Sequence, residues 1–238
     1  MNINDFNFKL PKSYISQSPK NIRSSSKLLV INRNNKKLID EKFDNIDKYV
    51  SSNDLIIIND TKVIPARIYG HRKNTKGKVE VFIERIIDIK TILCQIKSTR
   101  KLKKNDIIVI GRHIEIRIEK NKDDLVTIEI LNSTAKELLE NYGSIPLPPY
   151  ISRVPNANDK EFYQTIFAKN CGSVASPTAG LHFDSRILRK LSRKKVMISN
   201  LTLHIGMGTF SPIKTQDINN HNMHSEIYCL PQKTINDI

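Results

Sequence analysis

The sequence lacks the features that direct a chain into or across a membrane. Although 39% of its 238 residues are hydrophobic, no segment approaches the run of about 18 apolar residues that a membrane-spanning helix needs. The first residues, MNINDFNFKLPKSYIS, show no basic region followed by an apolar core and a small-residue cleavage site, so a secretory signal is not supported. We therefore expect a soluble, cytoplasmic protein without a membrane partner.

Cysteine is also scarce. Cys94, Cys171 and Cys229 are odd in number, lie far apart in the sequence and form no CxxC pair. This spacing disfavours both a disulfide framework and a zinc ribbon. We expect three free thiols and no metal ion as a cofactor.

Acidic residues are outnumbered by basic ones. Asp and Glu total 24 against 39 Lys and Arg, which gives a net charge of +15 and a pI of about 9.7. Such a charge indicates a polyanionic partner, although a coding bias toward Asn, Ile and Lys would produce the same excess. The basic clusters at 100–104 and 189–195 favour RNA or DNA, even though such runs are often only solvated faces.

A short apolar run predicts a strand in the first third of the chain. Leu55 to Ile58 in DLIIIND are four consecutive apolar residues, a pattern typical of a strand covered on both faces. Asn59, Asp60 and Thr61 follow at its carboxyl end, where open α/β sheets usually bind ligands. The same three residues are good turn formers, and the sequence alone favours the turn.

Strict alternation of apolar and charged residues follows between Ile68 and Leu131. It is clearest in KVEVFIERI, HIEIRIEK and LVTIEI. Several short alternating strands separated by polar stretches predict a small antiparallel barrel or sandwich that is inserted into an α/β domain. A helix is predicted next, from Ser133 to Tyr142, with an N-cap at its start and Gly143 at its end.

The four prolines of PLPPYISRVPN predict a stiff, extended connector that returns the chain from the inserted domain. Beyond it, helices are predicted for 159–168 and from the Asp184 cap to Lys195, and VMISNLTLHIG predicts a strand. The predicted fold class is therefore mixed α/β, with an inserted antiparallel β-barrel. The α/β domain comprises residues 1–67 and 146–238, and the β-barrel-like domain comprises residues 68–145.

Two glycine-containing loops could carry chemistry, and the first is PTAGLHF, from Pro177 to Phe183. Its small residues let a ligand approach the backbone, Thr178 offers a hydroxyl, and His182 can act as an acid or a base. The helix start that follows favours an anion. Alternatively, Pro-Thr-Ala-Gly is an ordinary turn and His182 is a hydrogen-bonded core residue.

The second loop belongs to LTLHIGMGTFSP. It places His204 near the end of a strand, followed by Gly206 and Gly208. A third glycine is missing and Ser211-Pro212 interrupts the segment, so a Rossmann dinucleotide site is disfavoured. The remaining interpretation is a loop whose backbone a ligand can approach closely.

The segment HNMHSE places His221, His224 and Glu226 within six residues. In a helix the two imidazoles would lie on adjacent turns and could bind a metal, but the HExxH arrangement is missing. The favoured roles are hydrogen bonding to a polar substrate or a helix cap.

Seven segments follow one another in an ordered series: NDTKVIPARIYG, GKVEVFIER, PLPPYISR, YQTIFA, GSVASPTAGLHF, TLHIGMGTF and HNMHSE. In this order they closely resemble the S-adenosylmethionine:tRNA ribosyltransferase-isomerase family of queuosine biosynthesis. The resemblance runs from near Phe6 to the last residue. Seven ordered matches are far more specific than any one of them.

The resemblance implies an enzyme that uses S-adenosylmethionine as a ribosyl donor and needs no metal. The implied acceptor is the aminomethyl group of 7-aminomethyl-7-deazaguanine at the wobble position of tRNA, and the implied products are epoxyqueuosine, adenine and methionine. The implied partner is therefore a tRNA anticodon stem-loop, bound by a monomer. An α/β domain interrupted by a β-barrel-like insertion is also implied, which agrees with the alternation of residues.

The same resemblance implies which residues form the site. The residues expected to transfer protons are His182, His204, His221 and His224, the first two foremost. The residues expected to bind the co-substrate are Asn59, Asp60, Thr61, Thr178, Gly180, Gly206, Gly208 and Thr209. The residues expected to contact RNA are Arg67, Arg153, Tyr150, Phe183 and Phe210.

The sequence also departs from this family. Family members contain motifs of the form GTTSxRxLE and TNFHxPxS, which do not occur here. We therefore expect a fragment or a natural truncation that lacks part of the α/β domain and of the active site, with activity reduced or lost. Two other functions stay open: a non-catalytic basic RNA-binding protein, and a metal-dependent hydrolase built on His221 and His224.

Overall fold

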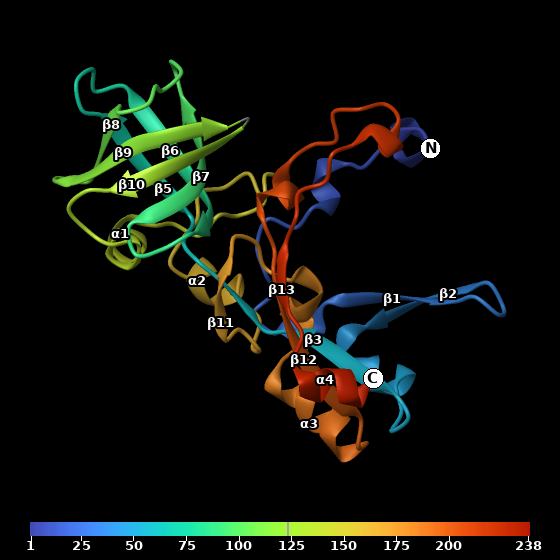
Figure 1. The fold of residues 1–238 in the computed structure, drawn as a ribbon. Helices are drawn as coiled ribbons and strands as arrows, with labels where there is room; N and C mark the ends of the chain where they lie inside the picture. Colours follow the sequence, from blue (N-terminus) through green and yellow to red (C-terminus); the bar gives the residue numbers. More distant parts are fainter. Residues whose placement is uncertain (123) are drawn as a thin grey trace.

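The computed structural model describes residues 1–122 and 124–238, and its largest unit is a closed β-barrel. Apart from α1, which lies beside the barrel, the remaining sheets and helices gather around β3 and β12, to one side of the barrel (Figure 1). The barrel strands are β5 (Arg67–Arg72), β6 (Lys78–Ile86), β7 (Thr91–Ser98), β8 (Ile107–Ile110), β9 (Ile114–Lys122) and β10 (Leu125–Ile130). The other strands are β1 (Lys27–Asn32), β2 (Lys37–Lys42), β3 (Leu55–Asn59), β4 (Thr61–Val63), β11 (Asn170–Ser173), β12 (Met197–His204) and β13 (Ile227–Cys229). The α-helices are α1 (Ala135–Tyr142), α2 (Asp159–Phe162), α3 (Ser185–Arg193) and α4 (Gln232–Asp237).

The barrel forms because its strands alternate between apolar and polar residues. Neighbouring strands are antiparallel in the order β10-β7-β6-β5-β8-β9, and β9 pairs with β10 to close the ring. On β6, Val79, Val81 and Ile83 are at most 2% exposed, while the residues between them are less buried. Closure leaves no open sheet edge in this unit. The predicted antiparallel β-barrel is confirmed, whereas the predicted domain boundaries stay a prediction.

Helix α1 follows the barrel and packs against it. Thr134 accepts a hydrogen bond from the backbone of Glu137, and the Glu137 side chain accepts one from Thr134 in return, which forms a capping box. Leu138 and Leu139 are buried in the barrel's core cluster. The predicted helix is confirmed, with its N-cap at Thr134. It ends at Gly143, where a Cβ atom would lie 2.3 Å from a backbone oxygen of Pro65.

The second unit is organised around β12. This strand is parallel to β3 and antiparallel to β13, in a three-stranded sheet of order β13-β12-β3. Helix α3 buries Ile187 and Leu191 in a cluster that includes Ile56 of β3. Asp184 caps α3 by accepting from two backbone N–H groups, each at 3.0 Å, as the sequence predicts. None of the helices in the described part of the chain combines the length and the apolar character that a membrane crossing requires.

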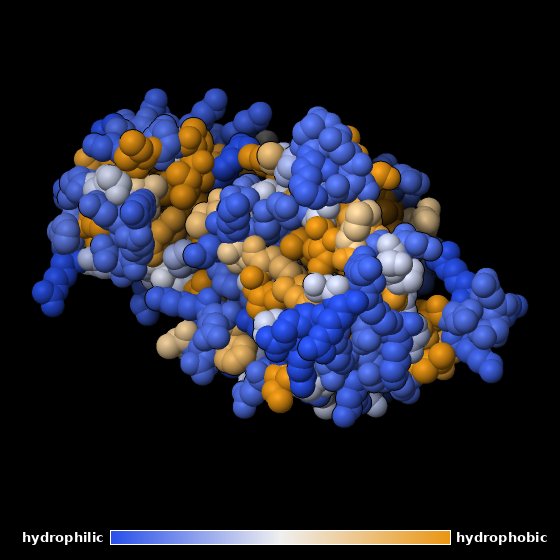
Figure 2. Space-filling view, turned by 90° about the horizontal axis from the view of Figure 1, so that it is seen from below, coloured by the Kyte–Doolittle hydropathy of each residue, from blue (hydrophilic) through white to orange (hydrophobic). Residues whose placement is uncertain are grey.

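The expectation that β3 is covered on both faces is wrong. One face of β3 packs against α3. Ile56 lies on that face, whereas Ile57 points the other way and is 42% exposed. Hydrophobic side chains also gather in the middle of the molecular face seen in Figure 2.

The helix predicted over 159–168 is also shorter than expected, since α2 ends at Phe162. The reason lies in Gln164. Its side chain accepts from the N–H of Val63 at 2.9 Å and donates to the Val63 carbonyl at 2.7 Å. This contact with β4 draws the chain out of the helix, which local sequence cannot reveal.

Truncating a barrel core residue should destabilise the protein strongly. Ile116 is fully buried, so Ile116→Ala is expected to lower the free energy of unfolding by about 2 to 5 kcal/mol. Ile89 is 72% exposed, and Ile89→Ala is the matched control, expected to change it by less than about 0.5 kcal/mol. Urea unfolding of both variants measures the difference. Equal effects would contradict the barrel core described above.

Candidate functional site

The two glycine-containing loops meet at the carboxyl end of β12. The buried Ser173 joins them, because its hydroxyl donates to the carbonyl of Ala175 at 2.6 Å and accepts from the N–H of Ile205 at 2.9 Å. The N–H of Val174 also donates to the carbonyl of Ile205 at 2.9 Å. The segment that leads into PTAGLHF therefore lies directly beside HIGMG.

A buried carboxylate fixes the corner at the end of β3. Asp60 is 5% exposed and accepts hydrogen bonds from Asn200 at 2.7 Å and Thr202 at 2.6 Å. Asn170 adds a third at 3.1 Å. The neighbouring Asn59 side chain bonds to the backbone of β12 through both its oxygen and its nitrogen. These two side chains hold the strands together, and their expected role in binding a co-substrate stays a prediction.

His204 lies where this corner meets the loops. The hydroxyl of Thr61 is 2.7 Å from Nδ1 of His204, which fixes the orientation of the ring. Gly172 has a φ of +151° and lies against the ring, where a Cβ atom would be 2.8 Å from Cε1. Burial lowers the pKa of the His204 imidazole, although the charge of Asp60 opposes this shift. A neutral imidazole held in one orientation can accept a proton.

A cavity of about 320 Å³, here called the histidine cavity, is lined by His204 together with two carboxylates. Glu84 reaches it from β6 of the barrel and accepts a hydrogen bond from the N–H of Met207 at 2.8 Å. Glu226 accepts one from the N–H of Gly206 at 3.0 Å. A Cβ atom at Gly206 would lie 2.8 Å from Glu84 Oε1, so a side chain at this position would displace the carboxylate.

The sequence alone does not indicate that Glu84 and Glu226 lie in one cavity. In KVEVFIERI, Glu84 occupies a position where an alternating strand normally carries a solvated charge. Glu226 attracts notice only through the two histidines that precede it. The signal that identifies both is tertiary, namely their contact with consecutive backbone amides of one loop.

His221 and His224 do not lie on adjacent turns of a helix, because residues 221–226 have no regular secondary structure. The helical arrangement considered for this segment is therefore wrong. His224 lies against Gly208, where a Cβ atom would be 2.9 Å from the imidazole Cδ2, and it lines the histidine cavity. Among the described residues, no group of three or more His, Cys, Asp or Glu side chains is arranged to hold a metal ion.

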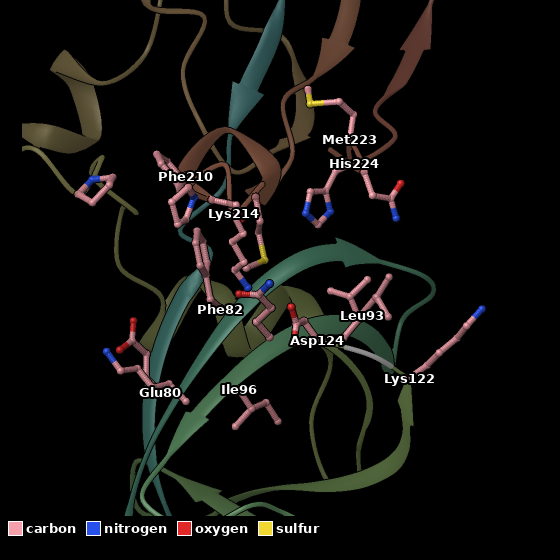
Figure 3. A pocket seen from close by; sticks show the side chains of 18 of the residues that line it. Glu80, Phe82, Leu93, Ile96, Lys122, Asp124, Phe210, Lys214, Met223 and His224 are labelled. Carbon is pink, nitrogen blue, oxygen red and sulfur yellow. The ribbon is translucent and has the colours of Figure 1, made fainter. Parts of the chain in front are cut away.

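A larger groove of about 1300 Å³, here called the basic groove, lies between the outer face of the barrel and the segment 207–224. Figure 3 shows Phe82 and Lys122 on the barrel side and Phe210 and Lys214 on the facing segment. The rings of Phe82 and Phe210 stack with centroids 5.9 Å apart. The basic side chains that line the groove are Arg67, Lys97, Lys120, Lys122 and Lys214; the acidic ones are Glu80 and Asp124. His221 and His224 also line it.

His182 lies elsewhere. It lines a separate cavity of about 450 Å³, together with Tyr150, Tyr163 and Thr178. Its ring is 5.4 Å from that of Phe43, and burial lowers the pKa of its imidazole. The structure therefore does not bring His182 and His204 into one cavity.

A further cavity of about 350 Å³, here called the bridging cavity, shares lining residues with each of these regions. Its lining brings together four of the expected site residues, Tyr150, Thr178, Thr209 and Phe210. Phe210 also lines the basic groove, and Tyr150 and Thr178 also line the cavity of His182. Both glycine-containing loops therefore contribute to this wall.

Three expected site residues make contacts within the fold. Arg153 forms two hydrogen bonds of 2.7 Å to the buried carboxylate of Asp159, which raise the pKa of the guanidinium and lower that of the carboxyl. Phe183 packs edge-on against Phe43 and Phe167. A Cβ atom at Gly180 would lie 2.9 Å from Cγ2 of Thr165. The roles expected of them in binding stay predictions.

Mild acid should destabilise the fold through two half-buried imidazoles. The pKa values of His182 and His204 are lowered in the folded state, so the unfolded chain takes up protons first as the pH falls. Above the unfolded histidine pKa of about 6.5, both states are neutral and the free energy of unfolding is unaffected. As the pH falls from there toward the folded pKa values, the free energy of unfolding decreases. Urea unfolding between about pH 8 and pH 5 measures this loss. His204→Asn should reduce it and His113→Asn, at an exposed site, should not.

Adding a methyl group at Gly172 should disturb His204. Gly172→Ala places a side chain at a left-handed φ and against the ring, so we expect a loss of about 1 to 3 kcal/mol in the free energy of unfolding. Gly77→Ala, whose Cβ would make only ordinary contacts of 3.5 Å or more, is the control. Histidine NMR signals should shift for His204 in the first variant alone. An unchanged spectrum would contradict the described contact.

Comparison with known proteins identifies relatives of this chain. The profile of a family described as queuosine biosynthesis protein matches residues 3–238. The relatives include proteins named S-adenosylmethionine:tRNA ribosyltransferase-isomerase. The one from Sulfurihydrogenibium sp. is 42% identical over 99% of this chain and 70% of its own length. Those from Buchnera aphidicola and Legionella pneumophila (strain Philadelphia 1) are 47% and 45% identical over 95% of this chain, and 64% and 66% of their own lengths.

A crystal structure of an S-adenosylmethionine tRNA ribosyltransferase from Thermotoga maritima also matches, with a TM-score of 0.40 and 22% identity, over 98% of this chain and 63% of that one. The chain spans 64 to 70% of the length of the three relatives named above. The family profile matches nearly the whole length of this chain. This chain therefore belongs to the S-adenosylmethionine:tRNA ribosyltransferase-isomerase family of queuosine biosynthesis proteins.

Proposed function

We propose that this chain catalyses the reaction for which its relatives are named, the transfer and isomerisation of the ribosyl moiety of S-adenosylmethionine onto tRNA in queuosine biosynthesis. The proposed acceptor is the aminomethyl group of 7-aminomethyl-7-deazaguanine at the wobble position. The observation that carries the proposal is the convergence of two imidazoles and two carboxylates on a cavity beside a basic groove, in a member of this family. Relatives named as enzymes favour catalysis over a non-catalytic RNA-binding role.

The histidine cavity suits the sulfonium end of S-adenosylmethionine. Glu84 and Glu226 present carboxylates there. Opposite charges attract more strongly in a partly enclosed cavity than in bulk water, because the effective dielectric constant is lower. The proposed binding mode therefore places the cationic sulfur of the co-substrate near these two groups.

His204 is the proposed base. The reaction needs removal of a proton from the carbon next to the sulfonium and protonation of adenine as it leaves. Burial lowers the pKa of His204, which favours its neutral form. We assign the proton of that form to Nδ1, which donates to the Thr61 hydroxyl, so Nε2 is the nitrogen proposed to accept the proton. His224 lines the same cavity and is proposed to protonate adenine. The amine of the modified base then attacks the ribosyl carbon, and an epoxide closes as methionine leaves.

The basic groove is the proposed contact surface for the tRNA anticodon loop. Its lysines would neutralise phosphates, which makes affinity fall as salt rises. Bases of a single-stranded loop can be splayed out and stacked on aromatic side chains. Phe82 and Phe210 supply such rings in the groove. The expected cytoplasmic location and monomeric state stay predictions.

Replacing His204 should slow the reaction strongly and leave tRNA binding unchanged. We expect the protein to release adenine from S-adenosylmethionine when tRNA carrying the aminomethyl-deazaguanine is present, and His204→Ala to slow this release by about 10² to 10⁴-fold. Chromatographic detection of adenine measures the rate, and filter binding measures tRNA affinity. His113→Ala, which removes an exposed barrel imidazole, is the control with unchanged activity.

Three results would contradict this proposal. Salt-sensitive tRNA binding without adenine release would identify a non-catalytic RNA-binding protein. Equal loss of affinity and turnover in His204→Ala would give His204 a structural role. Activity lost in chelator and restored by a metal would require a metal site that the proposal does not contain.

Lysines of the basic groove should contribute to tRNA affinity in a salt-dependent way. Lys122→Ala or Lys214→Ala is expected to lower affinity and to reduce the slope of log K against log salt by about 1 for each phosphate that is no longer neutralised. Lys136→Ala, at an exposed site on α1 outside the groove, is the control. Equal slopes in all three variants would show that the tRNA binds elsewhere.

A further inference from the structure

The bridging cavity contains a buried hydroxyl that the protein leaves without a partner. Ser176 is 4% exposed, and its Oγ makes no hydrogen bond to any described residue. Leaving a buried hydroxyl unpaired costs about 1 to 3 kcal/mol, so native proteins seldom retain one without a reason. Ser176 lines the cavity, so a rotation of its side chain would let a ligand held there supply the missing partner.

The rest of the wall indicates what kind of ligand this would be. Tyr150, Tyr163 and Phe210 provide aromatic rings, and Thr178 and Thr209 provide hydroxyls. Burial raises the pKa of Tyr163 to about 12, so its phenol is neutral at physiological pH. No charged side chain is among the described residues that line this cavity. A neutral, planar heterocycle with hydrogen-bonding edges fits such a wall better than a charged group does.

The position of the cavity connects it to both proposed substrates. Phe210 lines the bridging cavity and the basic groove, so a base leaving an RNA in the groove passes this ring. Ile205 lines the bridging cavity and the histidine cavity. Because Ile205 belongs to both walls, a base held in the bridging cavity would lie next to the histidine cavity and its two carboxylates.

We propose that the bridging cavity, with the unpaired hydroxyl of Ser176 in its wall, binds the extruded purine-type base of the tRNA. This inference rests on the proposed function and adds the place where the acceptor base is recognised. A base taken out of its stack is commonly read by hydrogen bonds to its edge and by stacking on aromatic rings. The adenine of S-adenosylmethionine has the same chemistry, but its sulfonium is better matched by the cavity that contains Glu84 and Glu226.

Binding of the free base tests this assignment without requiring turnover. Equilibrium dialysis with 7-aminomethyl-7-deazaguanine should show saturable binding, and Ser176→Ala should weaken it about three- to tenfold through loss of one hydrogen bond. Ala179→Phe fills the cavity from an exposed position and should reduce binding by about tenfold or more. Thr165→Val is the matched control, because Thr165 also has a buried unpaired hydroxyl but does not line the cavity. It should leave binding unchanged.

The outcomes separate this inference from the proposed function. No saturable binding, or equal binding by Ser176→Ala, Ala179→Phe and the wild type, would overturn the assignment while adenine release continued to support the enzyme. S-adenosylmethionine competing with the base, and itself weakened by Ser176→Ala, would assign the cavity to adenine instead. Absence of adenine release from the wild type, with base binding that still follows the variants, would overturn the proposed function alone.

Discussion

The hydrogen bonds to the buried carboxylate of Asp60 are the interaction on which the site depends. A buried charge is tolerated only when hydrogen bonds replace its hydration. Here the donors are Asn200 and Thr202 of β12 and Asn170 of β11. One side chain thus joins the corner after β3 to two strands that lie more than a hundred residues later in the sequence. Because Thr61 follows directly, the same bonds determine where its hydroxyl meets His204.

The barrel contributes directly to the site. Through Glu84 it supplies one of the two carboxylates of the histidine cavity and accepts a hydrogen bond from the loop that follows β12. Its outer face also forms one wall of the basic groove. A domain inserted into the chain therefore brings charge to the histidine cavity and surface to the groove. The proposed division of substrates between these regions depends on both units being present together.

The sequence predicts those features of the fold that depend on residues close together in the chain. Alternation of apolar residues is local, and it predicts the barrel; the Asp184 cap is local, and it predicts the start of α3. The early end of α2 depends on Gln164 pairing with a strand a hundred residues earlier, so no nearby residue indicates it. The sequence does not indicate the role of Glu84 for the same reason, since Glu84 contacts a loop that lies more than a hundred residues later. The motif resemblance indicates the four expected residues that meet at the bridging cavity, whereas only the missing hydrogen-bond partner of Ser176 indicates that residue.

The pairing of β12 also decides where the chain tolerates changes in length. Its register with β3 runs from Met197 opposite Leu55 to Leu201 opposite Asn59, and His204 lies three residues further on. Side chains alternate between faces with every residue of a strand, so one inserted residue would turn the imidazole to the opposite side. The exposed turn between β1 and β2 carries no such constraint. Insertions and deletions among homologues should therefore accumulate in that hairpin and be absent from β12, because the number of residues in β12 sets the face on which the imidazole of His204 lies.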